Sequence, residues 1–129
     1  MQYAQVGISL GRSADEENTG TISFGGVDPN LFEGDLTLMN NLAPNGFWEG
    51  ALASVSVNEM AVTEARSAIF DTRTALILAP AEDLVYLFST AEGAYFDAEN
   101  GLLLSCDAEY RMSFTFGETS FELDSRDLM

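Results

Sequence analysis

The sequence contains no histidine and no lysine, and its five cationic side chains are all arginines. Without an imidazole, a serine or cysteine nucleophile has no histidine to activate it, and a histidine-ligated metal site is excluded. Without a lysine, a Schiff base and the lysine of a phosphate-binding loop are excluded as well. The chemistry that remains for catalysis uses carboxylates, with hydroxyl groups in support.

Cysteine and long apolar runs are scarce too. Cys106 is the only cysteine, so the chain forms neither an internal disulfide nor a thiolate zinc cage. We expect an unpaired, half-buried thiol, whereas an exposed one could link two chains under oxidising conditions. No apolar run reaches the roughly 18 residues that span a membrane. The start at Met1 lacks the basic end and apolar middle of a signal peptide.

Acidic side chains dominate what is present: 21 Asp and Glu against five Arg give a net charge of -16 at pH 7. Such a chain repels polyanions, so neither nucleic acid nor an anionic membrane is expected as a partner. Because five arginines pair few of the acids, stability is expected to improve as the pH falls. The run Asp15-Glu16-Glu17 lacks the ligand spacing of a calcium loop and is interpreted as solvated, so neither a metal nor a cofactor is expected.

Alternation of apolar and polar residues predicts an all-β, mainly antiparallel fold with one short helix, as a single domain over residues 1–129. The expected strands are residues 4–11, 21–28, 34–41, 46–59, 101–106 and 111–124. The first two strands are expected to form a hairpin around the acidic loop 12–20. The last range is expected to fold into a hairpin around a Gly-Glu-Thr-Ser turn.

Three segments carry finer expectations. In residues 46–59 a bulge is expected at Gly50, and the buried side is expected to hold Phe47, Leu52, Val55 and Val57. The apolar character of residues 68–78 is typical of central strands covered on both faces. Residues 80–93 change to a helical period, with Pro80 at the start and Gly93 as the stop. Acidic residues at the positive end and one apolar face support this helix: Glu82, Asp83, Leu84, Leu87 and Phe88.

Asp71 is the one acid within the apolar stretch from Ala68 to Pro80, and Arg73 stands two residues after it. From the residues alone, Asp71 is either a turn residue whose side chain bonds the backbone two positions on, or a working carboxylate. Hydroxyls flank it at Thr72 and Thr74, where they are most simply strand-end groups.

Five stretches follow one another in a recognisable order: NTGTISFGGVDPNLFEGDLTLMNN, GFWEGALASVSVN, AIFDTRTALILAP, AEDLVYLFSTAEGA, and NGLLLSCDAEY with MSFTFGETSFELDSRDLM. In this order they resemble the carboxy-terminal lobe of pepsin-like aspartic peptidases, and most of all the fungal branch that includes polyporopepsin. The likeness covers essentially the whole chain. It implies an acid-protease lobe that is incomplete, because the other lobe and the last strands of this one have no counterpart here.

The resemblance also implies roles for single residues. Asp71 would be one half of a catalytic aspartate pair that activates water for acid peptide-bond hydrolysis, with Thr72 and Thr74 holding it by hydrogen bonds. Proton sharing between two carboxylates requires both of them, and one lobe supplies one. A peptide or protein substrate is therefore expected only if a second lobe is supplied. The cysteine that pairs with the counterpart of Cys106 in many relatives is absent.

Arg73 departs from the family, which has glycine at this position. A guanidinium beside Asp71 would lower the pKa of that carboxyl and oppose a shared proton. A homodimer would bring two arginines together with the two aspartates. We therefore expect the isolated chain to be inactive, either as a lobe of an aspartic endopeptidase or, alternatively, as a non-catalytic binding or interaction protein on a truncated lobe. Trp48 is expected in the core or at a lobe interface, and the family's fungal members suggest a secreted or vacuolar location.

Overall fold

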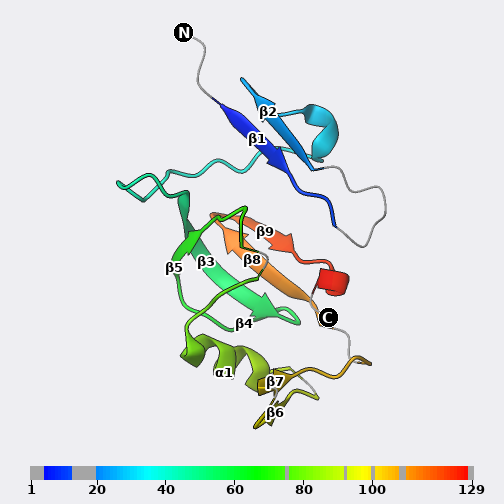
Figure 1. The fold of residues 1–129 in the computed structure, drawn as a ribbon. Coiled ribbons are helices and arrows are strands. Elements are labelled where there is room, and N and C mark those ends of the chain that lie inside the picture. Colours follow the sequence, from blue (N-terminus) through cyan, green and yellow to red (C-terminus); the bar gives the residue numbers. More distant parts are fainter. Residues whose placement is uncertain are drawn as a thin grey trace. The chain divides into compact units, whose positions relative to one another are not determined.

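Figure 1 shows the computed structural model of the chain, which describes residues 5–12, 20–74, 76–91, 93–99, 101–107 and 110–127. Two compact units are present, residues 1–36 and residues 37–129. Among the described residues, only the second unit contains buried hydrophobic side chains. The single domain expected over residues 1–129 stays a prediction. No helix in the described ranges is long and apolar enough to cross a membrane.

The first unit is a β-hairpin followed by a short 3-10 helix. β1 (Val6–Ser9) pairs antiparallel with β2 (Thr21–Phe24), which confirms the expected hairpin. The acidic loop between the strands falls on residues 13–19, outside the described ranges. After β2 the chain turns at Gly25, whose positive φ of 88° suits glycine. The 3-10 helix η1 (Pro29–Leu31) is capped by Asp28, which accepts a 2.9 Å hydrogen bond from the Asn30 backbone N–H.

The second unit is built on a five-stranded antiparallel sheet. Its strands are β3 (Glu49–Val57), β4 (Met60–Ala61), β5 (Arg66–Ile69), β8 (Met112–Phe116) and β9 (Thr119–Glu122). β3 pairs with β4 and β5 along one edge and with β8 along the other, and β9 pairs with β8. The hairpin expected over residues 111–124 is confirmed. The bulge in β3 lies between Leu52 and Ser54, not at Gly50.

A tight turn that the sequence analysis did not foresee joins β3 to β4. Asn58 and Glu59 have φ of 49° and 67°, the left-handed conformation that a two-residue hairpin turn requires. Asn58 is suited to this conformation, and its Oδ1 accepts a 3.1 Å hydrogen bond from the Arg111 backbone N–H. β3 therefore ends at Val57, two residues before the end of its expected range.

One α-helix packs against the sheet of the second unit through Leu87. α1 (Ala81–Ser89) begins after Pro80, as expected, and carries Glu82 and Asp83 in its first turn. Its C-cap is Thr90, so the helix ends before Gly93, which adopts a positive φ of 79° in the following loop. The apolar face expected of the helix is graded: Leu87 is buried, Phe88 is half-buried, and Leu84 is exposed.

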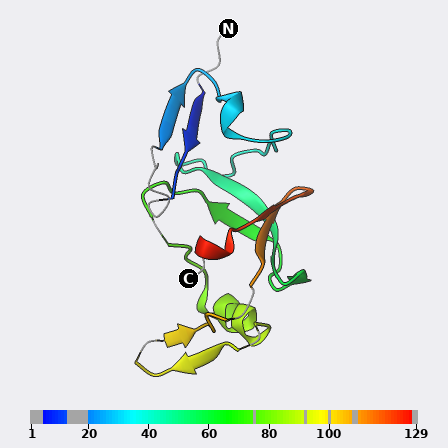
Figure 2. The same cartoon turned by 90° about the vertical axis from the view of Figure 1, so that its right-hand side faces the viewer.

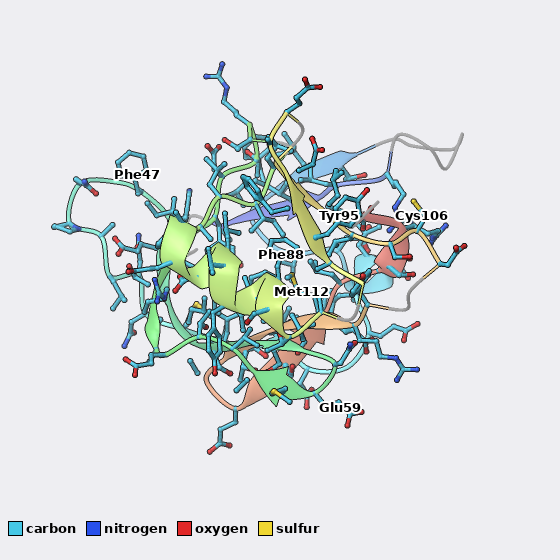
Figure 3. All side chains as sticks on the ribbon, turned by 90° about the horizontal axis from the view of Figure 1, so that it is seen from below. Phe47, Glu59, Phe88, Tyr95, Cys106 and Met112 are labelled. Carbon is cyan, nitrogen blue, oxygen red and sulfur yellow. The ribbon has the colours of Figure 1, made fainter. Side chains whose placement is uncertain are left out.

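The core lies between the sheet and α1. Its buried members are Leu52, Val55, Val57, Val62, Leu87 and Phe116. Each such side chain stabilises the fold by about 1.5–3 kcal/mol relative to an exposed position. Phe88 and Met112, both labelled in Figure 3, pack against this cluster. Phe47, which was expected on the buried side, projects away from the body in the same view because it precedes the first residue of β3.

A further hairpin, β6 (Tyr95–Asp97) with β7 (Gly101–Leu103), follows α1 and lies below it in Figure 2. The strand expected at residues 101–106 is therefore shorter than predicted, and β6 was not foreseen. Near the end of the described chain, residues 125–127 form the 3-10 helix η2 (Ser125–Asp127). All strand pairings among the described residues are antiparallel, and they accompany a single α-helix, which confirms the expected fold class.

Two strand predictions are wrong. Apolar and polar residues alternate in residues 34–41, but the segment forms no strand. An alternating segment becomes a β-strand only when it pairs with another strand, and this one has no partner strand in the described structure. Residues 68–78 were expected as buried central strands, yet β5 ends at Ile69 and Leu76, Ile77 and Leu78 are exposed. The turn at Asp71 interrupts strand pairing there.

Candidate functional site

Asp71 is held at the end of an edge strand. β5 pairs with the start of β3, and the Phe70 N–H donates a further 2.8 Å hydrogen bond to the Trp48 carbonyl oxygen. The Phe70 ring packs against Phe116, with centroids 5.2 Å apart, so the residue before Asp71 is anchored to the core. Asp71 is thus the first residue beyond the paired strand.

The Asp71 carboxylate is engaged within its own turn. Oδ1 accepts a hydrogen bond from the Arg73 backbone N–H at 2.9 Å, and Oδ2 accepts one from the Thr74 hydroxyl at 2.7 Å. Both bonds stabilise the ionised carboxylate, so the Thr74 hydroxyl first, and then the Arg73 N–H, hold the pKa of Asp71 below its ordinary value of 3.8. The contact to the residue two positions on is the turn geometry that the sequence suggested.

The role of Arg73 differs from the expected one. Its backbone N–H, not its guanidinium, contributes to the lowered pKa of Asp71. The guanidinium is exposed and makes no ion pair with a described residue. The two threonines also differ from each other. Thr74 binds the carboxylate, whereas the Thr72 hydroxyl makes no hydrogen bond within the described part of the chain.

Apolar side chains surround this turn and face solvent. Before it stand Phe47, Trp48, Ile69 and Phe70, and after it Leu76, Ile77 and Leu78. Trp48 was expected either in the core or at a lobe interface. It is 63% exposed, so it is not a core residue. Large apolar patches at a surface mark places where another surface binds.

The loop that carries Trp48 is organised by one side chain that the sequence analysis did not single out. Asn41 Nδ2 donates to the Phe47 carbonyl oxygen at 2.9 Å. Its Oδ1 accepts from the backbone N–H groups of Ala43 at 3.2 Å and Glu49 at 3.0 Å. Asn41 thereby sets the entry into β3, whose first residues pair with β5. An asparagine two residues before a proline-containing turn was the available signal.

Asp71 is the one acidic residue in the segment from Arg66 to Leu78. No second carboxylate contributes to the pKa shift of Asp71 within the described structure. The described residues also contain no group of three or more His, Cys, Asp or Glu side chains placed to hold a metal ion. Cys106, expected to be half-buried, is exposed and free.

Comparison with known proteins decides the family. Residues 6–129 match the sequence family described as eukaryotic aspartyl protease. The chain belongs to the eukaryotic aspartyl protease family. The match covers nearly every residue of the chain, so the pepsin-like character expected from the order of the five stretches is confirmed, and Asp71 belongs to an aspartyl protease domain.

Individual members of the aspartyl protease family give the extent of the match. The chain is similar to Rhizopuspepsin-1 of Rhizopus niveus, with 30% identity over 95% of this chain and 32% of that protein. It is also similar to the probable aspartic-type endopeptidase CTSD of Arthroderma benhamiae, with 27% identity over 95% of this chain and 24% of that protein. The chain thus spans about a third or less of the length of these curated relatives.

Proposed function

We propose that this chain is a lobe of an aspartic endopeptidase of the fungal, polyporopepsin-like branch, and that it is inactive by itself. Asp71 supplies one carboxylate of a pair, and the second comes from sequence outside this chain. The observation that carries the proposal is the position of Asp71: it belongs to an aspartyl protease domain, ends an edge strand, and faces solvent among exposed apolar side chains.

In the paired site, each carboxylate takes a different part. Two carboxyl groups within hydrogen-bonding reach do not both ionise, so they share one proton. The ionised member removes a proton from water, and the protonated member polarises the peptide carbonyl that the water attacks. Because the Thr74 and Arg73 donors favour the ionised form of Asp71, Asp71 would be the member that accepts the proton from water.

The isolated chain lacks the other half of this arrangement. A lone ionised carboxylate in a solvent-exposed turn has no protonated partner to polarise the substrate. Arg73 adds a positive side chain where the family has glycine, which restricts the close approach of a second carboxylate and its surrounding backbone. On this proposal the chain is a pseudoenzyme whenever it stands alone.

A chimera tests the proposal. In it, this chain replaces the matched region of Rhizopuspepsin-1, and cleavage of an unfolded protein is followed at about pH 3 to 5, where a shared-proton pair works. The chimera should cleave the unfolded protein. Asp71→Asn should lower the cleavage rate by about 10³-fold or more, as the loss of a catalytic group does. Arg73→Gly should raise the rate. A folded chimera whose activity is unchanged by Asp71→Asn would overturn the assignment.

The exposed apolar side chains favour one alternative, a non-catalytic binding or interaction protein built on the same lobe. Leu76 and Leu78 are more than 70% exposed, and exposed apolar side chains that cluster at a surface are unusual where no other protein covers them. A homodimer would cover such a surface, although a net charge of -16 on each copy opposes it. The same charge disfavours nucleic acid and anionic membranes as partners. A secreted or vacuolar location fits acid hydrolysis, and no metal or cofactor takes part in the proposed chemistry.

A further inference from the structure

A charged pair joins the two elements that flank the Asp71 turn. Arg66 lies at the first position of β5, and Asp83 lies in the first turn of α1, 17 positions later. Arg66 Nη2 donates to Asp83 Oδ1 at 2.8 Å, and Arg66 Nη1 lies 2.7 Å from Asp83 Oδ2. Two parallel contacts of this kind fix the orientation of both planar groups as well as their separation.

The pair is more enclosed than an ordinary surface ion pair. The Asp83 side chain is 11% exposed and that of Arg66 is 34% exposed. Arg66 Nε is buried and has no hydrogen-bond partner in the described structure, so the guanidinium is held in place by Asp83 rather than by several competing acceptors. A partly desolvated, two-point contact restrains its elements more firmly than an exposed pair does.

Little else holds the connecting segment. Between β5 and α1, Phe70 packs on Phe116, but every described residue from Asp71 to Pro80 is exposed. The hydrogen bonds of Asp71 to Arg73 and Thr74 lie within the segment and do not attach it to the sheet. The far end of the segment is therefore placed by α1, and α1 is held to the sheet by core packing at Leu87 and by Arg66–Asp83.

We propose that Arg66 and Asp83 are positioning residues for Asp71: they clasp the two ends of the segment that carries it and so hold the turn in which its carboxylate is fixed. As a role in catalysis this rests on the proposed function. As a restraint on the turn it concerns this chain alone. The Arg66–Asp83 clasp acts through backbone placement and touches neither substrate nor the reacting atoms.

The exposed pair Arg126–Asp124 provides a matched control. It too has two-point geometry, with Arg126 Nη2 at 2.6 Å from Asp124 Oδ2 and Nε at 3.0 Å from Oδ1. Its side chains, however, are 60% and 36% exposed, and the residues are two positions apart in the chain. Removing its charge with Arg126→Met should leave Asp71 unaffected. Val55→Ala is a second control, since it weakens the core without touching the clasp.

The test is an NMR titration of the Asp71 side-chain carboxyl carbon in the complete chain. In the wild type the midpoint should lie below 3.8, because Thr74 and Arg73 donate to the ionised form. Arg66→Met and Asp83→Asn should each move the midpoint up towards 3.8 and speed amide exchange at Arg73 and Thr74. The charge swap Arg66→Asp with Asp83→Arg should restore most of both properties.

The proposal is overturned if Arg66→Met and Asp83→Asn both fold and keep the wild-type midpoint, or if Val55→Ala shifts it equally. Should either clasp variant fail to fold, Arg66→Lys, which keeps the charge but loses the two-point contact, decides in its place. In the chimera, the clasp variants should lower kcat more than they raise KM. A shifted midpoint with an inactive chimera would refute the proposed function alone, and an active chimera with an unshifted midpoint would refute the clasp alone.

Discussion

At the scale of single residues, the charge of Asp71 is decided by donors within three positions of it. The Thr74 hydroxyl and the Arg73 backbone N–H both bind the ionised carboxylate, and the exposed guanidinium of Arg73 is not among the causes of the lowered pKa. The turn therefore prepares one ionised carboxylate by local chemistry, before any partner is present. The clasp between Arg66 and Asp83 holds the ends of that turn.

Replacing Thr74 with valine should raise the pKa of Asp71, because the larger of the two donor contributions is removed. A carboxyl whose pKa is lower in the folded state than in the unfolded chain adds stability above the unfolded pKa of about 3.8, and this is lost as the pH falls through the folded value. Thr74→Val should therefore have a lower free energy of unfolding than the wild type at about pH 6. This gap in the free energy of unfolding should narrow towards about pH 2.

Urea denaturation at both pH values measures this gap. Thr72→Val is the matched control, because the Thr72 hydroxyl makes no hydrogen bond with a described residue, so its effect should not depend on pH. A gap for Thr74→Val that is equally large at both pH values would show that packing, not the carboxylate, accounts for the change.

The sequence predicted part of this arrangement. An aspartate followed by a polar residue pair is typical of a side chain that bonds the backbone two positions on, and the contact to Arg73 is of that kind. The sequence did not distinguish Thr72 from Thr74, since the choice depends on how the backbone turns after Asp71. Nor did it pair Arg66 with Asp83, because a contact across 17 positions depends on how α1 docks.

At the scale of elements, local patterns predicted two of the hairpins and missed two others, β3–β4 and β6–β7, although all four join strands that lie close in sequence. Both hairpins that the sequence predicted, β1–β2 and β8–β9, are present, and α1 begins after its proline. The two wrong strand predictions concern partners that a local pattern does not specify. Residues 34–41 alternate without a strand beside them in the described structure, and Leu76, Ile77 and Leu78 are apolar without a covering layer.

Leu87 is the buried residue through which α1 reaches the core. Leu87 belongs to the core cluster, whereas Leu84, on the same helix, is 36% exposed. Leu87→Ala should lower the free energy of unfolding by about 2 kcal/mol or more, because it removes buried apolar volume, and Leu84→Ala should cost less than about 1 kcal/mol. Chemical denaturation compares the two. Equal losses would show that α1 does not pack as the structure has it.

At the scale of the whole molecule, the chain combines a strong negative charge with many solvent-exposed apolar side chains. Five arginines stand against 21 Asp and Glu side chains, so most of the acidic side chains have no arginine to offset them. A small core and exposed side chains such as Leu76 and Leu78 fit a lobe that binds another surface. The fold class was recognisable from the alternation of apolar and polar residues, and the family from the order of the five stretches.

What the sequence could not supply at this scale is the second carboxylate. The chain covers about a third of relatives such as Rhizopuspepsin-1, and its one aspartate at the motif position stands alone in the described structure. Proton sharing is a property of two groups held at a fixed separation, so no pattern around one of them establishes it.

The central claim, that Asp71 is half of a site and does not hydrolyse peptides by itself, is tested most directly by an acid cleavage assay of the purified chain. Wild type, Asp71→Asn and Arg73→Gly are incubated separately with an unfolded protein at about pH 3 to 5. The account predicts that all three show the same background, with no cleavage that depends on Asp71. Cleavage by the wild type that Asp71→Asn removes would contradict it.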